Sequence, residues 1–159
     1  MRVLVAVLSV SLITAVALAL WPAGPHGERA DRAYCLARLK SLTLATQLYA
    51  IGNDGRMPIG DWSSAIQPHV KSDLGPLRCP SLEHGSGYVM NGNLLGQKLS
   101  DDPELALLFE APDTRPGATA DRVSPIDRSR HDGRQFVGFA DGHVKGFPAE
   151  KVAQIRTTP

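Results

Sequence analysis

The first pattern along the chain is an uninterrupted apolar run, residues 3–21, that holds no charged side chain. A helix of that length measures about 28 Å at about 1.5 Å per residue, close to the hydrocarbon thickness of a bilayer. The run predicts an uncleaved membrane anchor, or alternatively a secretory signal that is cleaved near Ala17 and Ala19. In both cases we expect the rest of the chain to be exported.

A second pattern follows between Arg29 and Gly52, where apolar residues recur three and four positions apart, as on one face of an α-helix. The stripe consists of Cys35, Leu39, Leu42, Ala45 and Tyr49, widened by Leu44, Leu48 and Ile51, with Arg32, Arg38, Lys40 and Gln47 largely outside it. Asp31 is a candidate N-cap, and Gly52 a C-terminal stop. Because this face is broad, it needs a partner surface.

The two patterns are separated by a cluster of helix breakers at residues 22–28, with two prolines and two glycines. The chain therefore divides into an anchor or signal segment (1–21), a linker (22–28) and an exported domain (29–159). With 159 residues, 43% of them hydrophobic, there is room for one modest core.

After Gly52 the apolar runs are short and are bounded by turn residues. They predict a short helix that is capped by Asp61 and ends before Pro68, an extended run over 88–90 and a buried strand over 106–109. Residues 112–130 are polar and without periodicity, which predicts a long loop.

The last apolar runs flank Asp141-Gly142, the strongest short-range signal for a two-residue type I′ hairpin. In that register Phe136 pairs with Phe147. The residues then available to cover the Leu39 and Leu42 face of the helix are Val137, Phe139, Val144 and Phe147. We therefore expect an α+β fold, with the amphipathic helix packed on a small antiparallel sheet that ends in a β-hairpin.

The charge and the cysteine content of the chain limit the range of possible functions. Seventeen basic and sixteen acidic residues are spread along the chain, so there is no electrostatic footprint for nucleic acid. In an exported domain, Cys35 and Cys79 are candidates for one disulfide, worth about 3 to 4 kcal/mol in the chain-entropy model. Two buried free thiols are the alternative.

Four segments in order carry a family resemblance: YCLARLKSLTLATQLYAIGNDGRMP, RCPS, GYVMNGNLLG, and His131 followed after nine residues by Asp141-Gly142. Over residues 34–147 the chain resembles the bacterial pseudopilin-like family with the H-X9-DG domain, related to type II secretion pseudopilins and type IV pilins. The resemblance implies a pilin-like fold with an N-terminal membrane helix, and a structural or assembly role without catalysis.

The same resemblance implies a location and partners. We expect a single-pass protein of the bacterial inner membrane with its domain on the periplasmic side, or a secreted protein if the signal is cleaved. Its partners would be the membrane, other pilin-like subunits, and a secretion or pilus assembly machine. The chain departs from the family at its start, because the Gly-Phe-Thr-Leu-Ile-Glu motif is absent. We therefore do not expect processing by the prepilin peptidase, or the charge pairing in which that Glu takes part.

Two other functions remain open. Some pseudopilins bind calcium in loops before their last strands, and Asp113, Asp132 and Asp141 are candidate ligands here, although their spacing matches no EF-hand. The alternative interpretation is solvated loop charge. An enzyme would use His131, Asp141 and His143. We expect no catalysis, since the sequence contains neither His-Glu-x-x-His nor Gly-x-Ser-x-Gly. We expect His131 to cap or hydrogen-bond the loop that enters the last hairpin.

Overall fold

The structure is a computed structural model of the 159-residue chain and describes residues 26–70, 78–82, 84–112, 114–126 and 130–159. The predicted anchor over 1–21 and residues 22–25 of the linker lie outside the described residues. Within the described ranges, no helix is long and apolar enough to cross a membrane.

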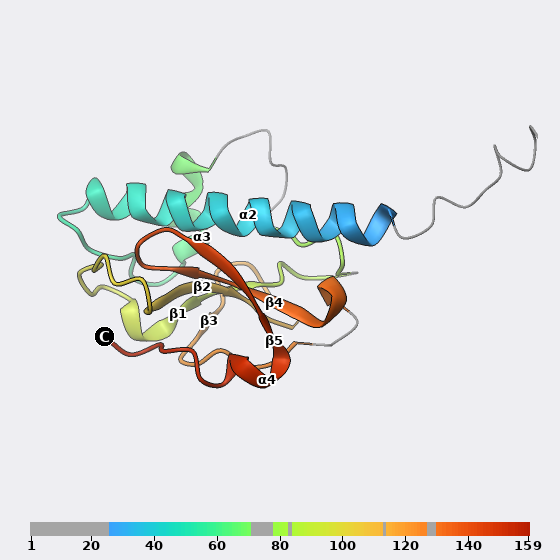
Figure 1. Cartoon of the computed structure of the whole chain (residues 1–159). Helices are drawn as coiled ribbons and strands as arrows, with labels where there is room; N and C mark the ends of the chain where they lie inside the picture. The colour runs from blue at the N-terminus through green and yellow to red at the C-terminus, as the bar shows by residue number, and fades with distance from the viewer. Residues whose placement is uncertain (1–25, 71–77, 83, 113, 127–129) are drawn as a thin grey trace, which may run out of the picture.

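The elements follow in the order α2 (His26–Ile51), α3 (Trp62–Ile66), η1 (Gln67–His69), β1 (Tyr88–Asn91), η3 (Gly92–Leu94), β2 (Ala106–Glu110), β3 (Thr119–Ala120), η4 (Arg130–Gly133), β4 (Arg134–Phe139), β5 (Val144–Pro148) and α4 (Ala149–Val152). The five strands form one sheet in the order β3-β1-β2-β4-β5. Helix α2 lies along one face of this sheet, and α4 lies on the opposite side (Figure 1).

The α+β prediction is confirmed, but two of its details are wrong. The sheet is mixed rather than antiparallel, because the predicted loop over 112–130 contributes β3, which pairs parallel to β1. The chain also continues past the hairpin. Helix α4 follows β5, and Arg156 forms a parallel bridge with Leu105. A two-residue strand and a single bridge carry too little periodicity to be recognised in a sequence.

Helix α2 begins at His26, inside the predicted linker, so Asp31 is a helical residue and not the N-cap. Both prolines of the breaker cluster precede His26, and a proline ahead of a helix does not interrupt its hydrogen bonds. The predicted end is confirmed, since the helix stops at Ile51 and Gly52 follows.

The buried face of α2 contains Cys35, Leu39, Leu42 and Ala45, as the periodicity predicts. The predicted widening of that face is wrong. Leu44, Leu48 and Ile51 are 43%, 49% and 78% exposed. At about 3.6 residues per turn these three positions lie opposite Cys35 and Leu42, and the sheet covers only one side of the helix. Arg38, predicted to lie outside the stripe, is 1% exposed.

The last hairpin differs from its predicted register by one residue. Phe136 pairs with Gly146, and Gly138 with Val144. The loop has three residues rather than two, because the Phe139 N–H donates to the His143 carbonyl at 2.9 Å. A type I′ turn requires positive φ at both Asp141 and Gly142, whereas only Gly142 has it, at 92°.

This one-residue shift changes which residues of the two strands share a face of the sheet. Val137, Phe139 and Phe147, predicted to cover the helix, instead pack on the opposite face of the sheet with Val152 of α4. The core under α2 receives Phe136 and Val144. Of the four residues expected against Leu39 and Leu42, only Val144 joins their cluster.

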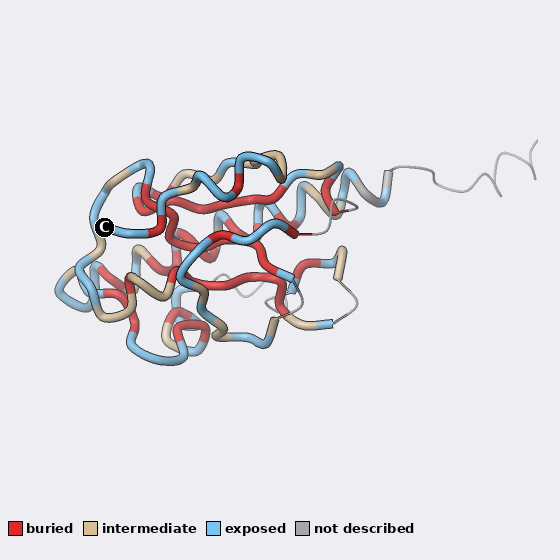
Figure 2. The backbone as a smooth tube through the Cα atoms, turned by 90° about the horizontal axis from the view of Figure 1, so that it is seen from below, coloured by how far each residue is buried: buried red, intermediate tan, exposed pale blue. Residues whose placement is uncertain are grey.

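A β-bulge in the central strand β2 decides which way its last residue faces. The register between β2 and β4 shifts between Ala106 and Leu108. As a result Leu107 and Leu108 both join the core under α2, and Phe109 points to the other side. The following residue, Glu110, therefore faces α2 beside its β1 partner Tyr88. Both residues are fully buried. Figure 2 shows that the strands inside the domain are buried along most of their length, whereas the surrounding loops are largely exposed.

Gly138 sets how closely α2 approaches the sheet. A Cβ atom built on Gly138 would clash with Thr43 Oγ1 and lie 3.3 Å from Thr43 Cβ. We expect Gly138→Ala to destabilise the fold by about 1–3 kcal/mol in urea unfolding, because the helix must move outward. The same change in a Thr43→Ala background should cost much less, since the blocking atoms are gone.

Gly27→Ala is the matched control for that experiment. Nothing lies within 4 Å of a Cβ built on Gly27, near the start of the same helix. We expect no loss of stability from it. Equal costs of Gly138→Ala in the two Thr43 backgrounds would contradict the proposed close contact.

The N-cap of α3 generates a pH-dependent prediction. Hydrogen bonds from the Ser64 hydroxyl, then the Ser63 hydroxyl, and from both backbone N–H groups lower the pKa of Asp61 to about 2. The folded pKa is below the unfolded value, so the ionised cap stabilises the fold above about pH 4, and this contribution is lost as the pH falls toward 2. Asp61→Asn keeps a capping oxygen but does not titrate. We expect the wild-type chain to lose stability relative to Asp61→Asn between pH 4 and 2 in urea unfolding. Parallel pH profiles would contradict this assignment.

Candidate functional site

The candidate site is a cluster of buried polar residues at the N-terminal half of α2, which includes the motif residue His131. It combines a disulfide between Cys35 and Cys79 with the side chains of Glu110, Arg130 and His131. Every one of these side chains is at most 6% exposed. Because a buried charge is costly unless it is paired, we expect each charged group of the cluster to have a hydrogen-bond or ion-pair partner.

The disulfide joins α2 to the loop that precedes β1. The Cα atoms of Cys35 and Cys79 lie 5.4 Å apart, within the usual range for a bonded pair. The Cys79 N–H donates to the Ser86 carbonyl at 3.0 Å, which holds the loop against the start of β1. The Tyr88 hydroxyl donates to the Cys35 carbonyl at 3.4 Å, from the sheet to the helix.

The Glu110 carboxylate is held from three directions. Its Oε2 accepts from the Phe136 N–H at 2.8 Å, and its Oε1 lies 2.9 Å from His131 Nε2. The Arg130 guanidinium lies 3.5 Å from the same Oε1 and donates its other amino group to the Ala111 carbonyl at 2.9 Å. These contacts compensate the desolvation of the carboxylate, and they tie η4 and β4 to the end of β2.

His131 reaches this carboxylate through an unusual backbone conformation. His131, Asp132 and Gly133 all have positive φ, at 52°, 57° and 74°. Glycine adopts the left-handed region freely, whereas His131 and Asp132 held there each cost on the order of 1 kcal/mol. The turn directs the imidazole inward, 5.3 Å from the Phe136 ring. The expected contact with the local loop is therefore replaced by a contact with a distant strand.

Two further polar side chains, Arg38 and Tyr88, are buried near the Glu110 carboxylate. Arg38 of α2 donates to the Tyr34 hydroxyl and stacks over that ring, 4.9 Å from its centroid. Burial, followed by the negative charge of Glu110, raises the pKa of Tyr88, while the Arg38 and Arg130 charges act in the opposite direction. Tyr88 is therefore a neutral hydrogen-bond donor in the cluster.

The other half of the motif, Asp141-Gly142, docks on the C-terminal half of the same helix. Lys40 Nζ donates to the Gly142 carbonyl at 2.5 Å, and Gln47 Nε2 donates to the Ala140 carbonyl at 2.9 Å. The positive φ of Gly142 favours glycine, and a Cβ there would lie 2.7 Å from Gln47 Oε1, so a larger residue would also displace the Gln47 amide. The Asp141 side chain accepts from the His143 N–H at 3.0 Å and completes the turn.

The nine-residue spacing in the motif is therefore set by the length of one strand. Between its two parts runs β4, which spans about 20 Å at 3.3 Å per residue. Along α2, the distance from Cys35 to Gln47 is about 18 Å at 1.5 Å per residue. His131 fixes one end of β4 beside the disulfide, and Gly142 fixes the other end beside Gln47.

The predicted calcium ligands do not form a group in the part of the chain that the structure describes. Asp113 lies outside the described residues. Asp132 forms an exposed ion pair with Arg32 at 2.7 Å, and Asp141 bonds to His143 Nδ1 at 2.7 Å. Of the residues suggested for an enzyme, Asp141 and His143 are bonded to each other, but His131 lies apart from them and contacts Glu110. His143 stacks on Phe139 with ring centroids 4.4 Å apart.

The residue that the sequence did not reveal is Glu110. The predicted strand stops at Phe109, and Glu110 has no motif of its own. One signal was present, since a carboxylate directly follows the most apolar run of the domain, LALLF. A carboxylate at the end of a central strand is buried more often than a loop carboxylate, and it then needs a partner.

The cluster also contains a set of potential metal ligands. Cys35, Cys79, Glu110 and His131 each offer one atom, and these four atoms lie within 4.8 Å of one another. Among the described residues, no other group of three or more His, Cys, Asp or Glu side chains meets this condition. As long as the sulfurs are bonded to each other, they are not available as thiolates.

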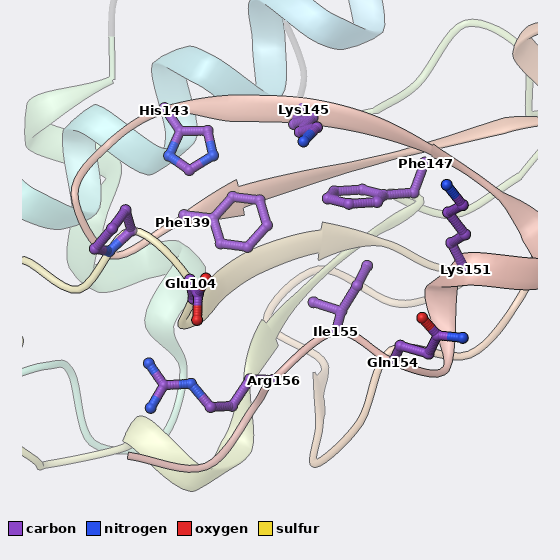
Figure 3. Close-up of a pocket in the computed structure, with 10 residues that line it drawn as sticks. Glu104, Phe139, His143, Lys145, Phe147, Lys151, Gln154, Ile155 and Arg156 are labelled. Atoms are coloured by element: carbon purple, nitrogen blue, oxygen red, sulfur yellow. The ribbon is translucent and has the colours of Figure 1, made fainter.

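A second candidate is a surface hollow of about 360 Å³ on the opposite side of the sheet, shown in Figure 3. Phe139 and Phe147 line it with their rings, 6.0 Å apart, and Lys145, Lys151 and Arg156 surround them. Cations around aromatic rings suit a small anion or a carboxylate. Its polar lining residues are all half-buried or exposed, so this is a less constrained arrangement than the buried cluster.

The buried pair can be tested by a double-mutant cycle. We expect Glu110→Ala to destabilise the fold by about 3–5 kcal/mol, because it leaves Arg130, His131 and the Phe136 N–H without their acceptor. His131→Ala should cost less, about 1–3 kcal/mol, since Glu110 keeps two partners. The coupling between the two substitutions in urea unfolding should be about 0.5–3 kcal/mol.

His143→Ala is the control, because this histidine also bonds to a carboxylate but lies at the surface. We expect it to change stability by less than about 0.5 kcal/mol. Additive effects of Glu110→Ala and His131→Ala would show that the two side chains do not interact.

Comparisons of the chain with protein-family models, curated proteins and solved structures found no match.

Proposed function

We propose that this chain is an exported, membrane-anchored and non-enzymatic subunit with a pilin-like head, which associates with further copies of itself through α2. The observation that carries the proposal is the second apolar face of this helix. Leu44, Leu48 and Ile51 lie one turn apart and are 43–78% exposed, on the side opposite the core. A helix that is apolar on opposite sides is normally covered on both.

The occupant that fits this face is the α2 helix of a second copy. The sequence places the apolar run over 3–21 directly ahead of α2. If that run anchors each copy in the same membrane, their heads are confined to one layer at high effective concentration. Weak contacts between short apolar stripes then suffice for association.

The family resemblance supports the same role. Helix packed on sheet is the arrangement that a pilin-like head requires. The Asp141-Gly142 half of the H-X9-DG motif attaches the sheet to α2, and His131 binds Glu110 of β2 beside the disulfide that holds α2. The proposed setting is the bacterial inner membrane, with the domain on the periplasmic side and a secretion or pilus assembly machine as partner. The disulfide agrees with an oxidising compartment.

The proposal predicts cross-links from one face of α2. A photoreactive amino acid at position 48 of the full chain, expressed in bacterial membranes, should give covalent dimers on irradiation. The same probe at Gln154, an exposed residue of the C-terminal segment, should give few. A double variant, Leu44→Lys with Leu48→Lys, is then tested with the probe at position 51. We expect its dimer formation to fall at least about 10-fold, because the two lysines of each copy repel those of the other across the contact.

Because Leu44 and Leu48 are half-exposed, the two lysines should change stability little, which circular dichroism would verify. Monomers alone from position 48 would contradict assembly through this face. Equal cross-linking from positions 48 and 154 would point to random collision in the membrane and would also contradict it.

A further inference from the structure

We propose that Cys35, Cys79, Glu110 and His131 form a zinc site whenever the two cysteines are reduced. The starting observation is the position of four ligand atoms from four separate parts of the fold. Cys35 comes from α2, Cys79 from the loop before β1, Glu110 from the end of β2, and His131 from η4. All four residues are buried, and their ligand atoms lie within 4.8 Å of one another.

The distances approach those of a tetrahedral site. With Zn–S near 2.3 Å and Zn–N or Zn–O near 2.0–2.2 Å, two ligands of one zinc ion lie about 3.3–3.8 Å apart. His131 Nε2 is already 3.5 Å from Cys79 Sγ and 2.9 Å from Glu110 Oε1. Breaking the disulfide lets the sulfurs separate from bonding distance to about 3.8 Å, a movement that rotation of the two side chains can supply.

The charges of the site balance. Two thiolates and the Glu110 carboxylate carry three negative charges, and neutral His131 adds none. Zn²⁺ and the Arg130 guanidinium, 3.5 Å from the Glu110 carboxylate, together neutralise them. Charge balance between the ligands, the zinc ion and the nearest cation lowers the desolvation cost that an unbalanced set of ligands would have. Thiolate, imidazole and carboxylate are also the ligand types that zinc prefers.

A surface hollow lies against the chain neighbours of both cysteines, while the cysteines themselves are fully buried, so entry of a metal ion requires a local opening of the chain here. The hollow, of about 500 Å³, is lined by Ala30, Asp31, Tyr34, Arg78 and Pro80. Tyr34 immediately precedes Cys35, and Arg78 and Pro80 flank Cys79, so the hollow opens beside both cysteines. It is large enough for a small reductant or a hydrated ion to approach.

Zinc binding and disulfide formation each have a complete balance of protons and electrons. A newly synthesised chain carries two thiols, and Zn²⁺ binding displaces one proton from each. In the disulfide form the Nε2 proton of His131 faces the Glu110 carboxylate, and Nδ1 has no hydrogen-bond partner. Zinc binding displaces the Nε2 proton, and the neutral ring then carries its one proton on Nδ1, so this change of tautomer releases no further proton. Conversion to the disulfide then needs a two-electron oxidant of the thiol–disulfide exchange class, which takes both electrons as the S–S bond forms and Zn²⁺ leaves.

Cobalt substitution tests the proposal. The full chain in detergent micelles is reduced with a phosphine and titrated with Co²⁺. We expect one equivalent to bind, with a thiolate-to-cobalt charge-transfer band and the visible bands of a tetrahedral ion, and Zn²⁺ should displace it. His131→Ala and Glu110→Gln should each bind at least about 100-fold more weakly, since loss of even an outer-shell partner costs about 10- to 100-fold. His143→Ala should bind like the wild-type chain.

His131→Cys keeps the test decisive if the alanine variant does not fold. It retains a zinc ligand, so binding should persist with a stronger charge-transfer band. A reduced wild-type chain without the charge-transfer band would overturn the proposal. So would bands that are unchanged in His131→Ala and Glu110→Gln, or binding by the oxidised chain that equals that of the reduced one. None of these results affects the cross-linking experiment, which uses the oxidised chain and the opposite face of α2.

Discussion

The carboxylate of Glu110 is the group on which the arrangement of the domain depends. It lies without solvent contact between helix and sheet, so it requires partners that the chain must bring from elsewhere. Those partners are an N–H group of β4, a guanidinium and an imidazole of η4. The contacts between Glu110 and these partners fix where β4 starts, and the turn that delivers the imidazole places residues 131–133 in the left-handed region. It also brings the imidazole beside the disulfide that holds α2. A single buried charge thereby couples the central strand, the edge hairpin and the long helix.

Much of the fold is predictable from local pattern, and the exceptions share a physical cause. Periodicity identifies α2 and its buried residues Cys35, Leu39 and Leu42, and Asp61 identifies the start of α3. The hairpin register was wrong because Asp-Gly is compatible with turns of two lengths, and Gly142 alone adopts positive φ. Whether the turn has two or three residues is decided by contacts with α2, which no short window of sequence contains.

The candidate site also depends on contacts between residues far apart in the sequence, which local patterns do not predict. His131 was recognisable through its spacing from Asp141-Gly142, but its role was not, because its partner is a strand residue 21 positions earlier. Glu110 faces α2 only because of the bulge in β2, which reverses the alternation after Leu107. No local pattern in the sequence LALLFE predicts that bulge. The helix shows the converse case, since Leu44 and Leu48 match the core pattern yet face outward. The spacing of apolar residues predicts which of them share a face of the helix, and the tertiary structure decides which face the sheet covers.

The covalent link between Cys35 and Cys79 also determines how the head responds to tension. If the chain is pulled at its N-terminus, force runs along the backbone only as far as Cys35. There it crosses the sulfur–sulfur bond to Cys79 and continues into the sheet, so the 43 residues between the two cysteines carry no load. That bypassed segment includes the rest of α2 and all of α3. The apolar face with Leu44 and Leu48 therefore keeps its helical shape under strain, and only the first turns of α2 can be drawn out.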